Sequence, residues 1–460
     1  MSALARYFHS RGVDVSGYDK TRSPLTAALE SEGIPVYFED NAAVADPAAD
    51  WVIYTPAIPA DSVLLGYYRK GGYPLLKRSD VLQQITADSY NICVSGTHGK
   101  TTITTLIAHI LRHSGYGGSA FLGGISVNYD TNYWSSDLSG RGLPGSGRPP
   151  AATERNVCVV EADEYDRSFL KLSPDIAVIT AMDPDHLDIY GTVGAMEEAF
   201  IAFAGRVKPG GWLLGKYGLT RTRDLAMALA DDSGRYRTYH LTDAQADVHA
   251  IRLQALDGTY FFDVRLPDAT LEDFTLHIGG LYNVENALAA IAVAYSLGIR
   301  AGAIRSAVSD FQGVRRRFEY IIRTPDLVLV DDYAHHPEEL RALICGARDL
   351  FPGRTCLVVF QPHLYTRTRD LAAEFAASLD LADEVILMPI YPARELPIQG
   401  VTSELILNRM KNPRKRIMTR EELLNWASTP QRGPLLVLMA GAGDIDSLVR
   451  PLAEKLKKSA

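Results

Sequence analysis

The stretch Cys93-Val94-Ser95-Gly96-Thr97-His98-Gly99-Lys100-Thr101-Thr102 decides how this chain folds. Residues 90–95 (YNICVS) are typical of a short buried strand, and residues 103–111 (ITTLIAHIL) are typical of an apolar helix. A strand, a glycine turn with Lys–Thr and a helix form a phosphate-binding loop, in which backbone N–H groups point at an anion. Lys100 adds a positive charge, and Thr101 offers a hydroxyl to Mg²⁺. The sequence therefore predicts a phosphate site here, although Val94 stands where the generic pattern has its first glycine.

The composition is that of a globular protein. With 460 residues the chain is long enough for about three domains. Its net charge of −8 disfavours nucleic acid as a partner. No apolar run approaches the ~20 residues that span a bilayer, and no signal peptide opens the chain. The four cysteines lie scattered in apolar segments, which is typical of a reducing compartment. We therefore expect a cytoplasmic protein without membrane insertion.

The first segment, residues 1–85, alternates strand and helix signals. Strands are predicted at residues 13–18 (VDVSGY), before Asp19, and at residues 51–54 (WVIY), before Thr55-Pro56-Ala57. An acid at such a strand end commonly meets a ribose or base, although a surface Asp is equally common there. Residues 2–11 read as an amphipathic helix without a preceding strand or glycine turn, whereas a parallel α/β domain normally begins with a strand. We therefore expect this domain to lack its first strand.

Two longer segments follow. The middle one, to about residue 312, has buried strands at 157–160 and 176–180, an apolar helix at 283–297, and a Gly/Pro/Ser-rich stretch, Ser135–Pro150, that we predict to be a mobile surface loop. The last segment predicts a doubly wound α/β domain. Its strands are expected at residues 327–330, 355–360, 384–388 and 434–439.

Acidic residues follow both buried strands of the middle segment. Glu161 opens EADEYD, where four acids in six residues favour a cation nearby over a solvated acidic turn. A carboxylate at the end of a strand near a phosphate loop is where a ligand of Mg²⁺ belongs. His186 stands among three acids in DPDHLD and could coordinate a metal, but the signal is weak because Mg²⁺ prefers oxygen ligands.

Further polar groups open helices or follow strands. Asn283 and Asn286 could bond an adenine-like ring, although Asn283 could equally cap its helix. The run Arg315-Arg316-Arg317 could clamp phosphates or form a solvated basic turn. The loops at 331–337 and 361–369, rich in His and Arg, both sit at strand ends where α/β domains bind ligands. The loop at 440–444 follows another strand and is expected to support the same rim.

Taken together, these pieces resemble the Mur ligase family, which builds the peptide of bacterial peptidoglycan. The motifs occur in family order over nearly the whole chain. They are SGTHGKTT (95–102), EADEYDRSFL (161–170), DPDHLDIY (183–190), NVENALAA (283–290), FQGVRRRFE (311–319), DDYAHHPEE (331–339), FQPHLYTRTRD (360–370) and AGAGD (440–444).

The resemblance implies an α/β fold of three domains. Residues 1–85 would form a truncated Rossmann-like domain for a UDP-sugar, residues 86–312 a P-loop ATPase-like domain with a mostly parallel sheet, and residues 313–460 a Rossmann-like domain for the amino acid. The implied activity is an ATP-dependent ligase that joins L-alanine to the lactyl carboxylate of UDP-N-acetylmuramate through an acyl phosphate. No nucleic acid partner is expected, and the chain would act as a monomer or homodimer.

The resemblance also assigns roles to single residues. Lys100 would meet the β- and γ-phosphates, Thr101 and Glu161 would hold one Mg²⁺, and His186 would help hold a second. The predicted ATP site comprises Gly96, Thr97, His98, Gly99, Lys100, Thr101, Thr102, Asn283, Asn286 and, after domain closure, Arg317. The predicted UDP-sugar residues are Asp19, Thr55 and Ala57. The alanine and muramyl side would be formed by Tyr333, His335, His336, His363 and Arg367, where a neutral His could take the ammonium proton of alanine.

Three departures from the family pattern bear on this reading. The glycine turn that normally cradles the UDP diphosphate is missing, Tyr282 replaces the usual His beside adenine, and no Lys lies between Asp188 and Phe203 to be carbamylated. One alternative is the recycling ligase that attaches a murein tripeptide, although YTRTRD and IYPARELP favour alanine. Another is a truncated, non-catalytic ATP-binding protein.

Overall fold

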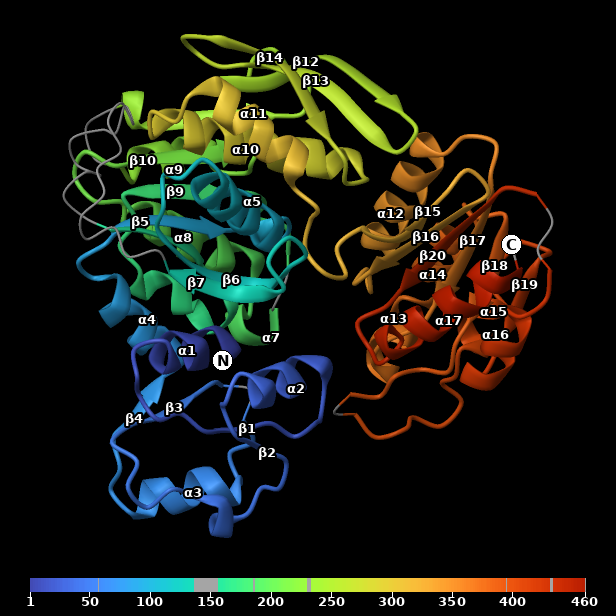
Figure 1. The fold of residues 1–460 in the computed structure, drawn as a ribbon, viewed down its shortest axis with the longest axis horizontal. Helices are drawn as coiled ribbons and strands as arrows, with labels where there is room; N and C mark the ends of the chain where they lie inside the picture. Colours follow the sequence, from blue (N-terminus) through green and yellow to red (C-terminus); the bar gives the residue numbers. More distant parts are fainter. Residues whose placement is uncertain are drawn as a thin grey trace.

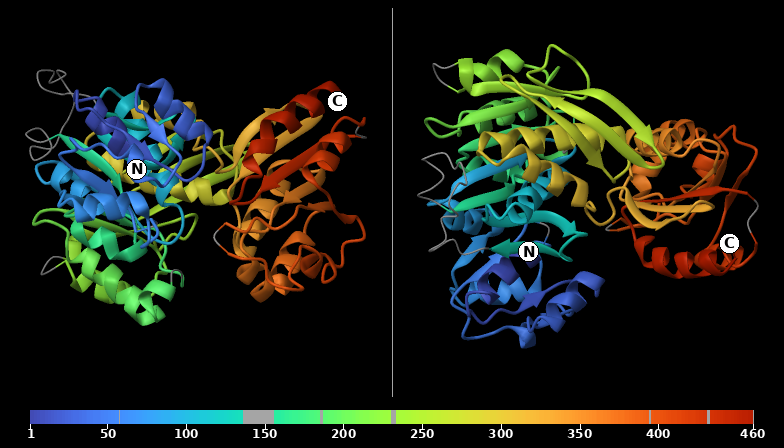
Figure 2. Two further views of the ribbon diagram at one scale, coloured as in Figure 1. Left: turned by 90° about the horizontal axis from the view of Figure 1, so that it is seen from below. Right: turned by 45° about the horizontal axis from the view of Figure 1, so that its top comes forward.

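The structure, a computed structural model, describes residues 1–56, 58–135, 156–184, 187–229, 233–393, 395–430 and 433–459. The ribbon forms three bodies in chain order (Figure 1): a small one in blue, a large one from cyan to yellow, and one in orange and red. Figure 2 shows from two more sides that the small and the C-terminal bodies both adjoin the large one. No helix in these residues is long and apolar enough to cross a membrane.

The first body contains short strands in two separate sheets. β1 (Gly17–Tyr18) pairs with β2 (Val36–Tyr37), and β3 (Val52–Tyr54) pairs with β4 (Leu75–Lys77), both in parallel. Within the described residues no strand joins the two sheets. The strand predicted at residues 13–18 is therefore wrong in its first four residues, which form no ladder. The other elements of this body are α1 (Ser2–His9), α2 (Pro24–Ser31), η1 (Ala42–Val44), α3 (Val63–Lys70) and α4 (Arg78–Thr86).

The middle body is built on one large sheet, in the order β14-β13-β12-β11-β10-β9-β5-β8-β6-β7. The strands from β12 to β6 in this order run parallel, and β13, β14 and β7 are antiparallel to their neighbours. The strands are β5 (Tyr90–Ser95), β6 (Ser119–Ser126), β7 (Thr131–Ser135), β8 (Val157–Glu161), β9 (Ile176–Ile179), β10 (Trp212–Lys216), β11 (Tyr236–His240), β12 (Val248–Leu256), β13 (Thr259–Arg265) and β14 (Thr270–Leu276).

Helices cover both faces of this sheet, which is why its central strands read as continuous apolar runs. Ile92 and Val94 of β5 face the core under α5, α10 and α11, whereas Cys93 between them faces the core under α8 and α9. The predicted phosphate-loop strand thus occupies the centre of the sheet, between β8 and β9. The helical segments are α5 (Lys100–His113), η2 (Tyr165–Lys171), α7 (Leu187–Tyr190), α8 (Val193–Ala204), α9 (Thr222–Met227), η3 (Ser233–Arg235), α10 (Leu281–Ser296) and α11 (Ala301–Asp310).

The C-terminal body is the doubly wound α/β unit that the sequence predicts. Its sheet has the order β15-β16-β20-β17-β18-β19, and only β15 among these strands is antiparallel to its neighbour. Helices α12 and α14 pack on one face, and α16 and α17 pack on the other. The strands are β15 (Glu319–Arg323), β16 (Leu327–Asp332), β17 (Thr355–Phe360), β18 (Glu384–Leu387), β19 (Lys415–Ile417) and β20 (Leu435–Ala440). The helices are α12 (Pro337–Leu350), α13 (Tyr365–Asp370), α14 (Ala372–Leu379), α15 (Glu404–Leu407), α16 (Arg420–Trp426) and α17 (Asp446–Ser459).

These sheets confirm the predicted fold class of three α/β parts with largely parallel strands. The loop predicted at Ser135–Pro150 lies outside the described residues except for Ser135, which ends β7.

The hairpin of β6 and β7 contacts the linker that leads to the C-terminal body. Val127 N donates to Gly313 O at 3.0 Å, and Arg315 N donates to Ile125 O at 2.9 Å. On the other side of the hairpin, Arg6 of α1 donates to Asn132 Oδ1 at 2.7 Å. The same hairpin therefore binds both the first body and the linker.

A buried histidine fastens α5 to its surroundings. His109 is fully buried, its Nε2 lies 2.8 Å from Ala307 O, and its Nδ1 lies 2.9 Å from the Tyr129 hydroxyl. Because Nε2 must carry a proton to bond a carbonyl oxygen, Nδ1 accepts from Tyr129 in the neutral ring. Burial lowers the pKa of His109 to about 4, against the opposing effects of Ala307 O and Asp310.

We predict that His109 makes the protein less stable in mild acid. Its folded pKa of about 4 lies below the ordinary value of 6.5, so the unfolded chain binds more protons and stability falls as pH drops below 6.5. Between pH 6.5 and pH 5 the titration of His109 lowers the free energy of unfolding by up to about 2 kcal/mol. Calorimetry at pH 7.5 and pH 5 should show a smaller drop in Tm for His109→Gln than for the parent protein. The exposed His113→Gln should keep the parent's drop, and equal drops in all three proteins would contradict this assignment.

Candidate active site

The phosphate loop is pressed between two neighbouring elements. Gly96 and Gly99 adopt φ values of 127° and 80°, in the region that favours glycine. A Cβ at Gly96 would overlap Thr180 at the end of β9, and one at Gly99 would lie 2.7 Å from Asn286 Oδ1 of α10. The loop also bonds to the chain after β9, since Thr97 N donates to Ala181 O at 3.1 Å. The structure thus brings the predicted phosphate loop and the predicted adenine residue Asn286 together.

Lys100, the first residue of α5, is held by a buried acid. Its Nζ donates to Gly96 O at 2.6 Å and to Glu164 Oε1 at 2.7 Å, and the Glu164 side chain is 1% exposed. Burial raises the pKa of Glu164, against the opposing effect of Lys100. Sequence reasoning noticed the acidic run EADEYD but attributed its charge to a metal. The structure shows that one of these acids pairs with the lysine of the loop.

Glu161 and Thr101 both lie beside two glycines of β6. Gly123 N donates to Glu161 Oε2 at 3.1 Å, and a Cβ at Gly124 would lie 3.0 Å from Thr101 Cγ2. Among the described residues no group of three or more His, Cys, Asp or Glu could hold a metal ion. One carboxylate and one hydroxyl beside a phosphate loop still fit Mg²⁺, which keeps several waters and binds through substrate phosphates. Two predicted site residues, His186 and Ala57, lie outside the described residues.

At the start of α10, the two asparagines have different partners. Asn283 Nδ2 donates to Gly279 O at 2.6 Å, and Asn286 Nδ2 donates to Asn283 Oδ1 at 3.1 Å. The N-cap of this helix is Gly280, so Asn283 does not act as the cap. Both amides are buried, whereas Tyr282 is 37% exposed. Asn283 therefore orients Asn286, whose Oδ1 faces the phosphate loop.

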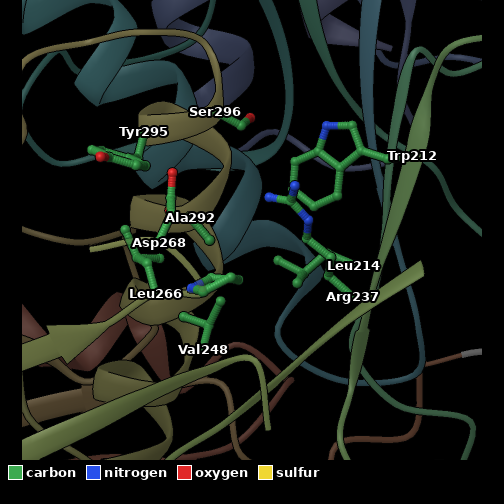
Figure 3. Close-up of a pocket in the computed structure, with 10 residues that line it drawn as sticks. Trp212, Leu214, Arg237, Val248, Leu266, Asp268, Ala292, Tyr295 and Ser296 are labelled. Atoms are coloured by element: carbon green, nitrogen blue, oxygen red, sulfur yellow. The ribbon is translucent and has the colours of Figure 1, made fainter. Parts of the chain in front are cut away.

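The pocket in Figure 3 lies elsewhere on the same helix. Its lining includes Trp212, Arg237 and Tyr295, and it faces the C-terminal half of α10. The cavity volume is about 20 Å³, which suits a single water molecule. This pocket is therefore separate from the phosphate loop.

The three consecutive arginines of the linker have three different surroundings. Arg315 pairs with Asp130 of the β6–β7 turn at 2.8 Å. Arg316 lies within the C-terminal body, with Asp446 Oδ2 at 3.4 Å and the carbonyl oxygen of Gly441 as a hydrogen-bond partner. The guanidinium of Arg317 lies 5.1 Å from the centre of the Tyr333 ring, and that of Arg316 lies at the same distance from this ring. Of the three, only Arg317 has neither an ion pair nor a hydrogen bond from its guanidinium within the described residues, so it fits a phosphate best.

The rim of the C-terminal body brings several predicted residues together. His335 Nδ1 lies 3.0 Å from Tyr333 O and 3.3 Å from Glu339 Oε2. The rings of His335 and His363 are 6.1 Å apart. Arg367 NH1 is buried and has no hydrogen-bond partner among the described residues. His336, the N-cap residue of α12, is exposed.

Burial and two arginines favour the neutral form of His335. Burial lowers its pKa, Arg367 and Arg317 lower it further, and Glu339 opposes them. Its Nδ1 carries the proton when it donates to Tyr333 O, so the neutral ring presents Nε2 as an acceptor. For Glu339, burial is outweighed by His335, Arg317 and the loop residue His98, which together lower its pKa. The rim therefore lies within electrostatic reach of the phosphate loop.

Two buried acids end β16 below this rim, and sequence reasoning gave them no separate role. Asp332 accepts from Phe318 N and Ala334 N, both at 2.7 Å, and Asp331 Oδ2 lies 3.8 Å from Arg316 Nε. Burial raises the pKa of Asp331 to about 7 and that of Asp332 to about 6. Both acids contact the linker, Asp332 at Phe318 and Asp331 at Arg316.

In the first body the predicted sugar residues lie on separate sheets. Asp19 follows β1 and accepts from Thr21 N at 3.0 Å, and Thr55 follows β3. Asp19 is exposed and Thr55 is half-buried. The described contacts do not bring these two side chains together.

Comparison with known proteins covers all three bodies. Residues 1–90 match the model of the Mur ligase family catalytic domain. Residues 94–294 match the Mur ligase middle domain, and residues 316–443 match the Mur ligase glutamate ligase domain.

Full-length relatives match as well. UDP-N-acetylmuramate–L-alanine ligase from Porphyromonas gingivalis W83 is 44% identical over 462 residues, covering 99% of this chain and 96% of the relative. The crystal structure of UDP-N-acetylmuramate-alanine ligase from Thermotoga maritima is 26% identical with a TM-score of 0.81, covering 100% of this chain and 97% of that one. A murein peptide ligase from Psychrobacter arcticus, 22% identical with a TM-score of 0.66, covers 99% and 96% and shares the fold.

We predict that Asp331→Asn changes stability, relative to the parent protein, more favourably at pH 8 than at pH 5. The folded pKa of about 7 lies above the ordinary 3.8, so the folded protein binds more protons than the unfolded chain. The contribution of this carboxyl to the stability of the protein therefore falls as pH rises from about 4 to about 7. An amide has no such proton to lose. The Tm of the variant minus that of the parent should therefore be more positive at pH 8 than at pH 5. The exposed Asp349→Asn serves as control, and a difference independent of pH would refute the prediction.

Proposed function

This chain belongs to the Mur ligase family, and on that premise we propose that it joins L-alanine to UDP-N-acetylmuramate at the expense of ATP. The observation that carries the proposal is the 44% identity, over 99% of the chain, to relatives with that activity in their name. The phosphate loop facing a rim of His and Arg supports it, because the reaction needs both in one site.

We further propose that the three bodies divide the substrates. Residues 1–85 would hold the UDP-sugar, with Asp19, Thr55 and Ala57 as candidates. Residues 86–312 would bind ATP, and residues 313–460 would bind the amino acid and close over both. Closure fits the linker geometry, because Arg317 lies where the two larger bodies meet.

The first step would activate the lactyl carboxylate. A carboxylate is a poor electrophile, so the γ-phosphoryl group of ATP must first convert it into an acyl phosphate. Phosphoryl transfer depends mostly on positioning and charge neutralisation. Lys100, released from Glu164, would bind the β- and γ-phosphates, and Arg317 would reach them on closure. Thr101 and Glu161 would hold Mg²⁺, which neutralises phosphate charge. His186 would help hold a second ion.

The second step would form the amide. His335 is the best candidate to accept a proton from the alanine ammonium group, because its neutral ring presents Nε2. The free amine would then attack the carbonyl carbon of the acyl phosphate, and inorganic phosphate would leave. Arg367, whose buried NH1 has no hydrogen-bond partner among the described residues, would pair with the alanine carboxylate. Tyr333 and His363 complete this wall.

The proposed setting is the cytoplasm, with the chain acting as a monomer or homodimer. Cys93, Cys158, Cys345 and Cys356 are free thiols, as expected in a reducing compartment. The recycling ligase for murein tripeptide is the second candidate, because the Psychrobacter murein peptide ligase shares the fold over 99% of this chain.

The test is phosphate release from ATP with each substrate present or omitted. We expect release only when UDP-N-acetylmuramate and L-alanine are both present, and its loss by at least about 10³-fold in Lys100→Met, because a phosphate contact that neutralises the transition state is removed. Release with the tripeptide, and not with alanine, would favour the recycling ligase. ATP binding without release under any condition would leave only the non-catalytic alternative.

A second prediction separates the three arginines. Arg317→Ala should lower kcat by about 10³-fold or more, as expected for an arginine that contacts a transferring phosphoryl group. Arg315 lies two residues earlier, and Arg315→Ala loses only a half-exposed ion pair with Asp130. The kcat of this variant should therefore stay within a few-fold of the parent value. Steady-state kinetics with saturating substrates measure both. Equal losses in the two variants would argue that the run acts as a hinge and not through a phosphate contact.

A further inference from the structure

Gly123 of β6 occupies a position where a side chain has no room. A Cβ built there would overlap Cδ and both carboxylate oxygens of Glu161. The three heavy atoms nearest to this added Cβ all belong to the Glu161 carboxyl group. The carboxylate therefore fills the space that a side chain at Gly123 would need. The backbone N–H of Gly123 also donates to Glu161 Oε2 at 3.1 Å.

The backbone conformation of Gly123 does not explain the glycine. Its φ lies outside the left-handed region, so alanine could adopt the same backbone. Glycine inside a strand lacks a side chain to pack, and it often marks a close approach of another group. Here the approaching group is the Glu161 carboxylate.

The next residue, Gly124, makes a second close approach on the same strand. A Cβ there would lie 2.7 Å from Val314 Cγ1 and 3.0 Å from Thr101 Cγ2. Two adjacent glycines therefore clear space for the two side chains that the proposed function assigns to the cation. Val314 belongs to the linker, and it bridges to Ser126 at the end of the same strand.

We propose that Gly123 is a positioning residue for the cation of the ATP site. Its N–H fixes Oε2 of Glu161, and its missing side chain leaves the room that the carboxylate occupies, so that Oε1 would be the oxygen available to the ion. This inference rests on the proposed function, since it assumes that Glu161 and Thr101 hold Mg²⁺. It assigns the strand β6, which the sequence motifs do not include, to the metal site.

The test measures the Mg²⁺ dependence of ADP binding, not ligase activity. Isothermal calorimetry or a fluorescent ADP analogue gives the ADP affinity as Mg²⁺ is raised at constant ionic strength. In Gly123→Ala we expect half-maximal enhancement to need about tenfold more Mg²⁺, because the displaced carboxylate binds the ion less well. The ADP affinity without Mg²⁺ should stay within twofold of the parent.

The matched control is Gly194→Ala on α8, where an added Cβ meets nothing within 4 Å. This variant should keep the parent's Mg²⁺ dependence. In a Glu161→Ala background, adding Gly123→Ala should change nothing further, because the clashing carboxylate is gone.

The outcomes separate the two proposals. If ADP binding by the parent protein does not depend on Mg²⁺, the proposed cation site fails and this inference fails with it. If the parent depends on Mg²⁺ and Gly123→Ala matches it, only this inference is overturned. Should Gly123→Ala fail to fold, the double variant Gly123→Ala/Glu161→Ala must fold, and its failure would show that Glu161 is not what fills the space.

Discussion

The close approach of the glycine turn to its two neighbours is the constraint on which the site depends. Gly96 meets the end of β9 and Gly99 meets Asn286 of α10, so neither can carry a side chain. That contact fixes the turn at the carboxyl edge of the sheet, between the carboxylate of Glu161 and the asparagines of α10. α/β folds bind ligands at this edge because helix N-termini and loop N–H groups converge there.

Charge balance follows from the same geometry. Lys100 at the start of α5 is a partly buried cation, and Glu164 supplies the opposing charge at 2.7 Å. Two of the linker arginines are likewise paired with acids. Arg315 pairs with Asp130, and Arg316 pairs with Asp331 and Asp446. Among the described residues, the Arg317 guanidinium forms no ion pair of this kind, although its charge lowers the pKa of Asp332 and of Glu339. One run of like charges thus combines two structural roles with one that suits a ligand.

Sequence reasoning could predict what depends on neighbours along the chain. The strand, turn and helix around Lys100 carry their own periodicity, and the parallel strands 157–160 and 355–360 are apolar because both faces are buried. It missed Glu164 as the partner of Lys100, 64 residues away, and Gly123 as the space for Glu161, 38 residues away. Such pairs depend on strand order, which no local pattern reveals. The strand at residues 13–16 was over-predicted for the same reason, because apolar alternation cannot say whether a partner strand is present.

The β6–β7 hairpin links these features physically. β6 holds Glu161 through Gly123 and accepts a hydrogen bond from the linker at Ile125, Val127 after β6 donates one to the linker, and β7 contacts α1 through Asn132. Val314 of the linker packs against β6 at Gly124, the residue after the glycine whose N–H donates to Glu161. The linker to the C-terminal body and the Glu161 carboxylate therefore contact the same strand, at two consecutive residues.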